Sequence, residues 1–271
     1  MALAQAPEKR AMAERSSSLE TVLRHDRLAV LAGVVLLVAL AWGYTAYLAH
    51  AMGVMEMSET LMPMSAAWSA PEFVFTVAMW LIMMVAMMLP TAAPYLLIFA
   101  RVNRNRRAKG GPYVPTALFA CGYLVSWGAF SFAAAGAQWA LQSSLLIDMN
   151  YASATPYLAG GLLVAAGLYQ WTPLKHACLK SCRSPFDFIA NRWREGRLGA
   201  LRMGLEHGTF CVGCCAALMV LLFVFGVMNL VWIAGLAAFA LTEKLIARGP
   251  AFSRVSGAVL VLGGVSWMLA G

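Results

Sequence analysis

The feature that most constrains this chain is a series of continuous apolar runs, because lipid must replace water around such runs. Of its 271 residues, 61% are apolar and only 12% are charged. The mean hydropathy of +0.71 is well above that of a water-soluble domain with a charged surface. The sequence therefore excludes a secreted disulfide scaffold, a nucleic-acid-binding domain and a disordered chain.

Seven of the runs are each long enough to cross a bilayer. They cover residues 28–49, 73–100, 115–142, 156–172, 203–225, 230–247 and 251–270. We therefore predict an all-α fold, a polytopic integral membrane bundle of about seven transmembrane helices. Residues 1–27 are expected to form a cytoplasmic N-terminal arm, and residues 28–271 a single transmembrane helical domain.

The basic residues indicate how this bundle is oriented. All 20 Lys and Arg residues fall on one side of the layout, within residues 9–27, 101–109, 175–202 and 244–254. Cytoplasmic loops carry an excess of such residues, so we expect a cytoplasmic N-terminus and an external C-terminus. The expected location is the bacterial inner membrane. The first run is too long for the apolar core of a cleaved signal peptide.

The strongest motif is EHGTFCVGCC at residues 206–215. At 3.6 residues per turn, one helix face carries His207, Cys211, Cys214 and Cys215. Imidazole and thiolate are ligands that Cu(I) and Zn(II) prefer. Glycines at 208 and 213 leave room beside this face for a neighbouring helix. The alternative is small-residue packing with a hydrogen-bonded histidine near the interface.

A second pair of thiols, Cys178 and Cys182, has the same i, i+4 spacing if the fourth helix continues past Pro173, a residue that can break a helix. Nearby positive charge favours the thiolate by lowering the pKa of a thiol. The flanking basic residues are Lys175, Lys180 and Arg183. A reducing cytoplasm makes the five clustered cysteines ligands or redox groups rather than structural disulfides. The alternative is an ordinary basic loop with two incidental thiols, and the isolated Cys121 is expected only to pack.

Methionines cluster in two places. The first external loop contains Met52, Met55, Met57, Met62 and Met64. The second span carries Met79, Met83 and Met87 on one face, with Met84 and Met88 on the adjoining face. Thioethers bind Cu(I) without deprotonation, although such a stripe on a helix is also typical of core packing.

Depth in the membrane relates these clusters, provided that the second and fifth spans are neighbours. Met87 and Met88 are then expected to lie level with Cys215, so that a soft ion meets thioethers first and thiols and imidazole next. Pro90 and Pro94 are expected to bend the second helix and to free backbone carbonyls beside this path.

Several of these segments resemble the bacterial DUF2182 family over about residues 73–248. They are MMVAMMLP (83–90), GLYQ (167–170), PLK (173–175), CLKSCRSP (178–185) and CVGCC (211–215), followed by GVMN (226–229) with Trp232, Glu243 and Lys244. Ala216 stands where that family often has Trp. The family is described as predicted metal-binding integral membrane proteins, so the resemblance implies metal handling.

Three hypotheses about function follow. The first is a metal-handling membrane protein that binds Cu(I), or alternatively zinc, for transport or delivery. Its expected ligands are His207, Cys211, Cys214, Cys215, Cys178, Cys182, Met79, Met83, Met87 and Met88. The second is a membrane thiol-disulfide oxidoreductase that uses Cys211 and Cys214 as a CxxC pair. The third is an assembly subunit that places metal into another membrane enzyme.

The expected partners are the bilayer, a metal ion and a periplasmic or membrane metalloprotein, and no nucleic acid. No Walker A sequence, aspartyl-phosphate motif or Gly-rich nucleotide loop is present, so nothing in the sequence couples ATP to movement. We expect no enzyme activity unless the redox hypothesis holds. Glu243 and Lys244, near the inner end of the sixth span, are either a proton-linked or ion-paired site or, more commonly, a snorkelling lysine beside an acid.

Overall fold

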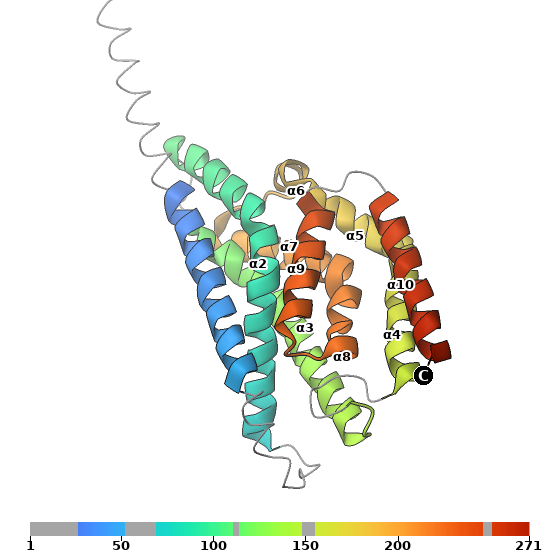
Figure 1. The fold of residues 1–271 in the computed structure, drawn as a ribbon. Helices are drawn as coiled ribbons and strands as arrows, with labels where there is room; N and C mark the ends of the chain where they lie inside the picture. Colours follow the sequence, from blue (N-terminus) through green and yellow to red (C-terminus); the bar gives the residue numbers. More distant parts are fainter. Residues whose placement is uncertain (1–26, 52–68, 111–113, 148–154, 246–250, 271) are drawn as a thin grey trace, which may run out of the picture.

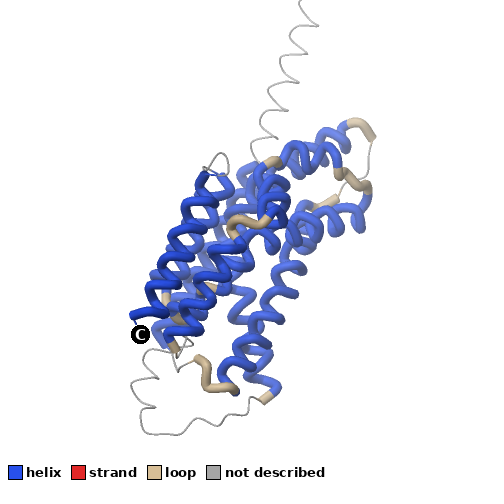
Figure 2. Tube along the Cα trace, turned by 90° about the vertical axis from the view of Figure 1, so that its right-hand side faces the viewer, coloured by secondary structure: helices blue, strands red, loops and turns tan. Residues whose placement is uncertain are grey.

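The computed structural model describes residues 27–51, 69–110, 114–147, 155–245 and 251–270. Within these ranges the regular secondary-structure elements are all α-helices, as Figure 2 shows. The predicted all-α class is confirmed. The expected N-terminal arm and the methionine-rich loop lie outside the described residues.

The described helices begin with Arg27–Ala51, which precedes the labelled elements. The others are α2 (Ala70–Ala108), α3 (Thr116–Ser143), α4 (Pro156–Tyr169), α5 (Pro173–Arg183), α6 (Pro185–Asn191), α7 (Gly196–Val220), α8 (Leu222–Phe225), α9 (Leu230–Leu245) and α10 (Ala251–Ala270).

Five helical segments in the described ranges are long and apolar enough to cross a membrane. They are Arg27–Ala51, Ala70–Ala108, Thr116–Ser143, Gly196–Phe225 and Ala251–Ala270. The remaining two predicted spans correspond to α4 with 14 residues and α9 with 16 residues. At 1.5 Å per residue they reach only about 21 and 24 Å, less than the hydrocarbon thickness of roughly 30 Å. The count of seven spans therefore stays a prediction.

Proline and threonine decide where the predicted fourth span ends. Pro173 has no backbone N–H, so it starts a helix more readily than it continues one. Thr172 caps this new helix, and its hydroxyl accepts a hydrogen bond of 3.3 Å from the backbone N–H of Lys175. α4 accordingly ends at Tyr169, and Cys178 and Cys182 lie on the separate helix α5.

Glycines set the closest helix contact of the bundle, between α3 and α7. A Cβ atom added at Gly204 would collide with the backbone carbonyl of Phe119, and one added at Gly208 would lie 2.6 Å from the hydroxyl of Ser126. Such small residues let two backbones approach closely. The predicted close approach at Gly208 is confirmed, and it fixes the position of the helix that carries three of the cysteines.

The two prolines inside α2 accompany the predicted bend, but a carbonyl that they free has a different partner from the predicted one. The helix runs unbroken through Pro90 and Pro94, and Figure 1 shows it changing direction along its length. Pro90 cannot donate to the carbonyl of Ala86, four residues earlier. The indole N–H of Trp42 donates to that carbonyl at 3.1 Å. The freed group thus anchors the helix Arg27–Ala51 against α2, rather than facing a metal path.

A buried ion pair joins three elements at one end of the bundle. The Lys175 ammonium on α5 lies 2.9 Å from a carboxylate oxygen of Glu243 on α9, and both side chains are buried. The second carboxylate oxygen of Glu243 accepts a 2.9 Å hydrogen bond from Ser253 on α10. Since a buried charge is costly without a partner, this pairing ties α5 to α9 and α10.

Candidate metal centre

The structure brings four thiols from α5 and α7 together in the interior, and we call them the sulfur cluster. It consists of Cys182, Cys211, Cys214 and Cys215. The Cys214 sulfur lies 3.4 Å from that of Cys215 and 3.7 Å from that of Cys182. The Cys211 side chain interacts with those of Cys182 and Cys215. Residues that are 29 positions or more apart in sequence therefore share one site.

These sulfur separations suit a shared metal. Two thiolates on one tetrahedral metal lie about 3.8 Å apart when each metal–sulfur bond is about 2.3 Å long. As the side chains stand, however, no group of three or more His, Cys, Asp or Glu residues in the described ranges could hold a metal ion. The sulfur cluster thus fits a soft ion by its donor chemistry and spacing, and closing it around an ion requires side-chain rotation.

Gly213 allows α5 to approach the cysteine face of α7. A Cβ atom added there would lie 2.7 Å from the sulfur of Cys178. The hydroxyl of Tyr169 donates a hydrogen bond to the Gly213 carbonyl, which holds the end of α4 at the same place. The room predicted beside Gly213 is therefore filled by Cys178, and this contact sets Cys182 against Cys214.

A lysine from α9 enters the sulfur cluster. The Lys244 ammonium donates hydrogen bonds of 2.9 Å to the Cys211 sulfur and of 3.2 Å to the Thr91 hydroxyl. Lys244 is only 5% exposed, so the prediction of a snorkelling lysine is wrong. The reason is tertiary: α9 packs between α2 and α7, so the end of its side chain meets a thiol instead of water.

A tyrosine from α3 completes the surroundings of Cys211. The Tyr123 hydroxyl donates to the carbonyl of Met88 at 2.9 Å and lies 3.1 Å from the Cys211 sulfur. Met88 on α2 is therefore level with Cys211, about one helical turn from the predicted level of Cys215. Sequence patterns did not single out Tyr123, because an aromatic residue on an apolar helix has no distinguishing signal.

His207 lies one helical turn before Cys211 and is buried, at 2% exposed. Neither of its ring nitrogens has a hydrogen-bond partner in the described part of the chain. Its ring stacks on Tyr95, with centroids 3.7 Å apart, and further aromatic rings surround it. Both nitrogens are therefore available for a ligand. Binding one would offset the cost of burying an imidazole without a hydrogen-bond partner.

The four methionines proposed as ligands line the core instead of forming a visible site. Met79, Met83, Met87 and Met88 are all buried in the core that also contains the cysteines. Tyr95 on α2 stacks on His207 of α7, and Tyr123 on α3 lies between the Met88 carbonyl and the Cys211 sulfur. Their role as ligands stays a prediction.

Two cysteines lie apart from the sulfur cluster. Cys178 is 9% exposed on α5, which is outside the membrane-spanning segments, and burial raises the pKa of its thiol. The predicted lowering of the thiol pKa by the flanking basic residues is wrong for Cys178, because burial acts in the opposite direction. Lys175 and Arg183 are engaged by Glu243. Cys121 is exposed on α3 and does not pack into the interior.

Residues 77–267 match the model of the family described as "PpoB2: Copper chaperone". The chain belongs to the PpoB2 copper chaperone family. The match includes every residue of the sulfur cluster, together with His207 and Lys244. No curated protein and no solved structure matches the chain significantly.

Membership of the PpoB2 family supports copper handling. The sequence resemblance implied metal handling in general, and the comparison does not confirm the DUF2182 name. The PpoB2 match begins within α2 and extends into α10, so it leaves out the helix Arg27–Ala51. It reaches beyond the expected limit of residue 248 and includes most of α10. The helices that build the site thus belong to the family region.

Proposed function

We propose that this protein is an integral membrane copper chaperone that binds Cu(I) on the sulfur cluster and delivers it to a metalloprotein partner. The observation that carries this proposal is the convergence of four buried thiols with S–S separations of 3.4 and 3.7 Å. Thiolates are soft ligands that favour Cu(I), and the family match points to the same metal. Zinc is the alternative metal.

His207 is proposed as an additional ligand, since its two ring nitrogens have no other partner in the described structure. It lies on the same face of α7 as Cys211, one turn away. Cu(I) accepts two or three such ligands, so the sulfur cluster and the imidazole offer more donors than one ion needs. An excess of donors suits a protein that must pass its ion on by exchange of ligands.

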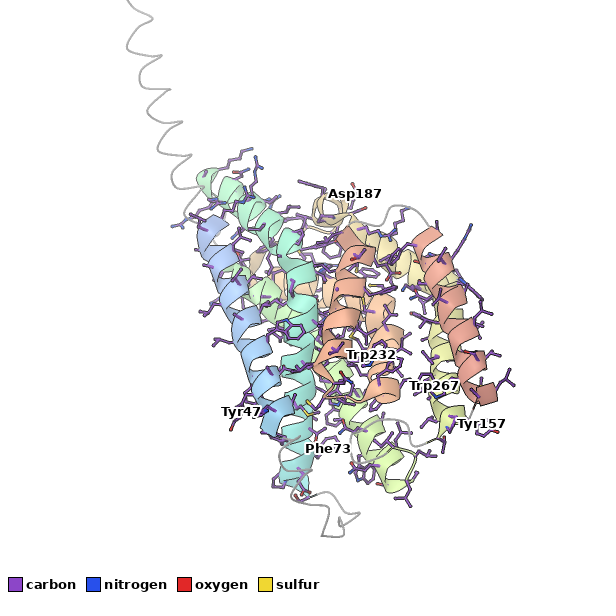
Figure 3. All side chains as sticks on the ribbon, in the orientation of Figure 1. Tyr47, Phe73, Tyr157, Asp187, Trp232 and Trp267 are labelled. Carbon is purple, nitrogen blue, oxygen red and sulfur yellow. The ribbon has the colours of Figure 1, made fainter. Side chains whose placement is uncertain are left out.

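We place the protein in the bacterial inner membrane with its N-terminus in the cytoplasm. The support is the segregation of basic residues and the arrangement of helix ends. In Figure 1, one end of the bundle contains the start of the helix Arg27–Ala51, the C-terminal end of α2, α5, α6 and the start of α10, and the C-terminal end of α10 lies at the other. In Figure 3, Asp187 lies at the first end and Phe73 and Tyr157 at the second.

The test is replacement of Cys211 and Cys214 together by serine in the full-length protein, purified in detergent under reducing conditions. Hydroxyls are poor ligands for soft metals, so stoichiometric Cu(I) binding should be lost while the yield of folded protein stays comparable. Elemental analysis and competition with a chromophoric Cu(I) chelator measure the bound metal. Cys121→Ser is the matched control, because Cys121 is an exposed cysteine of α3 and not a member of the sulfur cluster.

Other functions predict other results. If the cysteines only pack, metal content is the same in all proteins and stability falls slightly in the double variant. If Cys211 and Cys214 are a redox pair, wild-type protein purified in parallel without reductant contains a titratable disulfide, and neither preparation contains stoichiometric metal. Wild-type protein that binds no copper after Cu(I) loading would falsify the proposal. Copper flux in vesicles then separates a transporter from a chaperone that delivers to a partner.

A further inference from the structure

We propose that Lys244 is a specificity-determining residue, whose fixed positive charge adapts the sulfur cluster to a monovalent ion. This inference rests on the proposed function, because it assumes that the sulfur cluster binds a metal. The observation behind it is an ammonium group deep inside the protein whose hydrogen-bond partners in the described structure are one thiol and one hydroxyl.

The charge of Lys244 has no carboxylate to balance it within the described structure. The adjacent residue, Glu243, directs its carboxylate to Lys175 and Ser253 instead. The Thr91 hydroxyl and the Tyr123 hydroxyl near Cys211 are neutral groups. Since a buried cation needs an anionic partner, the Cys211 sulfur is the group that can provide it, as a thiolate.

The total charge of the site then depends on the metal that enters. When Cu(I) binds between Cys211 and Cys214, the Cys214 thiol releases its proton to solvent and the oxidation state does not change. The two thiolates and Cu(I) carry a net charge of −1, which the Lys244 ammonium neutralises. Zn(II) on the same two thiolates is already neutral, so the ammonium leaves that complex with an excess charge of +1. Excess charge is costly in an apolar interior.

The fixed position of the Lys244 ammonium strengthens the effect of its charge on the bound metal. The Thr91 hydroxyl donates a hydrogen bond of 2.8 Å to the Met88 carbonyl and accepts one of 3.2 Å from the Lys244 ammonium. α2 thus holds the ammonium beside Cys211. The ammonium is therefore fixed next to a proposed ligand, where its charge acts at short range with little screening by water. Removing only the Thr91 hydroxyl should leave the charge in place.

The experiment compares Lys244→Met, Lys244→Arg and Thr91→Val with the wild type, as full-length protein in detergent. The affinities for Cu(I) and for Zn(II) are measured separately by competition with chromophoric chelators. For Lys244→Met we expect Cu(I) affinity to fall roughly 10- to 100-fold, the range for loss of a hydrogen bond to a charged group. Zn(II) affinity should stay unchanged or increase. Lys244→Arg should recover most of the Cu(I) affinity, and Thr91→Val should lose only a few-fold.

The two metals separate a charge effect from damage to the fold, because damage lowers both affinities. Equal losses of Cu(I) and Zn(II) affinity in Lys244→Met, or no loss of either, overturn the inference while leaving the proposed function intact. Wild-type protein that binds neither metal overturns both. If Lys244→Met does not fold, Lys244→Gln takes its place, and a Gln variant that holds Cu(I) as tightly as the Arg variant again overturns the inference.

Discussion

Two cysteines on the same helix, one turn apart, have different surroundings. The Cys182 sulfur lies 3.7 Å from that of Cys214, whereas the sulfur of Cys178 is next to the backbone at Gly213. Their spacing makes them equivalent in the sequence. Only the rotation of α5 against α7 distinguishes a member of the sulfur cluster from its neighbour.

This difference gives a prediction for single substitutions. Cys182→Ser should weaken Cu(I) binding by roughly 10-fold or more, because it replaces a thiolate by a poor ligand. Cys178→Ser should change Cu(I) affinity by less than about threefold, since a serine there removes no member of the sulfur cluster. Chelator competition on both variants measures the contrast, and equal losses would show that Cys178 is also a ligand.

At the scale of helices, the contact between α3 and α7 holds the cysteine face in place. The backbones meet at Gly204 and Gly208, where no Cβ atom fits without a shift of the neighbouring chain. α5 is held in turn by the pairing of Lys175 with Glu243 and by the hydroxyl of Tyr95, which donates to the Ser181 carbonyl at 2.5 Å. Each cysteine-bearing helix thus has its own anchor outside the sulfur cluster.

We therefore expect Gly204→Ala to destabilise the protein, because the added methyl group meets the backbone carbonyl of Phe119 rather than a flexible side chain. Overpacking of this kind typically costs about 1–3 kcal/mol of unfolding free energy. Gly136→Ala on α3 is the control, since nothing lies within 4 Å of a Cβ atom there. Alanine at that helical position should be neutral or stabilise by up to about 1 kcal/mol. Thermal unfolding in detergent tests the pair, and similar midpoints for both variants would contradict the close contact.

For the whole molecule, the central question is how the bundle lies in the membrane. The start of the helix Arg27–Ala51 and the C-terminal end of α10 are at opposite ends of the bundle in Figure 1. A reporter fused after Gly271 should therefore be external, and one fused within residues 104–109 should be cytoplasmic, as the basic residues predict. Enzymatic reporters that are active on only one side of the membrane give this result directly. An internal C-terminus would contradict the proposed orientation and the count of seven spans.

Sequence patterns alone determined the helical class and which cysteines share one helix face. Apolar runs and 3.6-residue spacing are local properties, so the face that carries Cys211, Cys214 and Cys215 follows from the chain itself. The same local rules predicted that Pro173 can break the helix, and in the structure a new helix begins there with Thr172 as its N-cap.

The tertiary structure decided which residues meet. Cys182 joins the sulfur cluster, and Cys178 does not, because Gly213 sets the distance between α5 and α7. Lys244 contacts Cys211, which is 33 positions away in the sequence. The Ala86 carbonyl, which Pro90 leaves without a helical donor, accepts a hydrogen bond from the indole of Trp42. Spacing along one helix carries no information about such contacts, since they depend on the packing of several helices at once. The fourth thiol, from Cys182, and the charge of Lys244 beside Cys211 were therefore determined only by the assembled bundle.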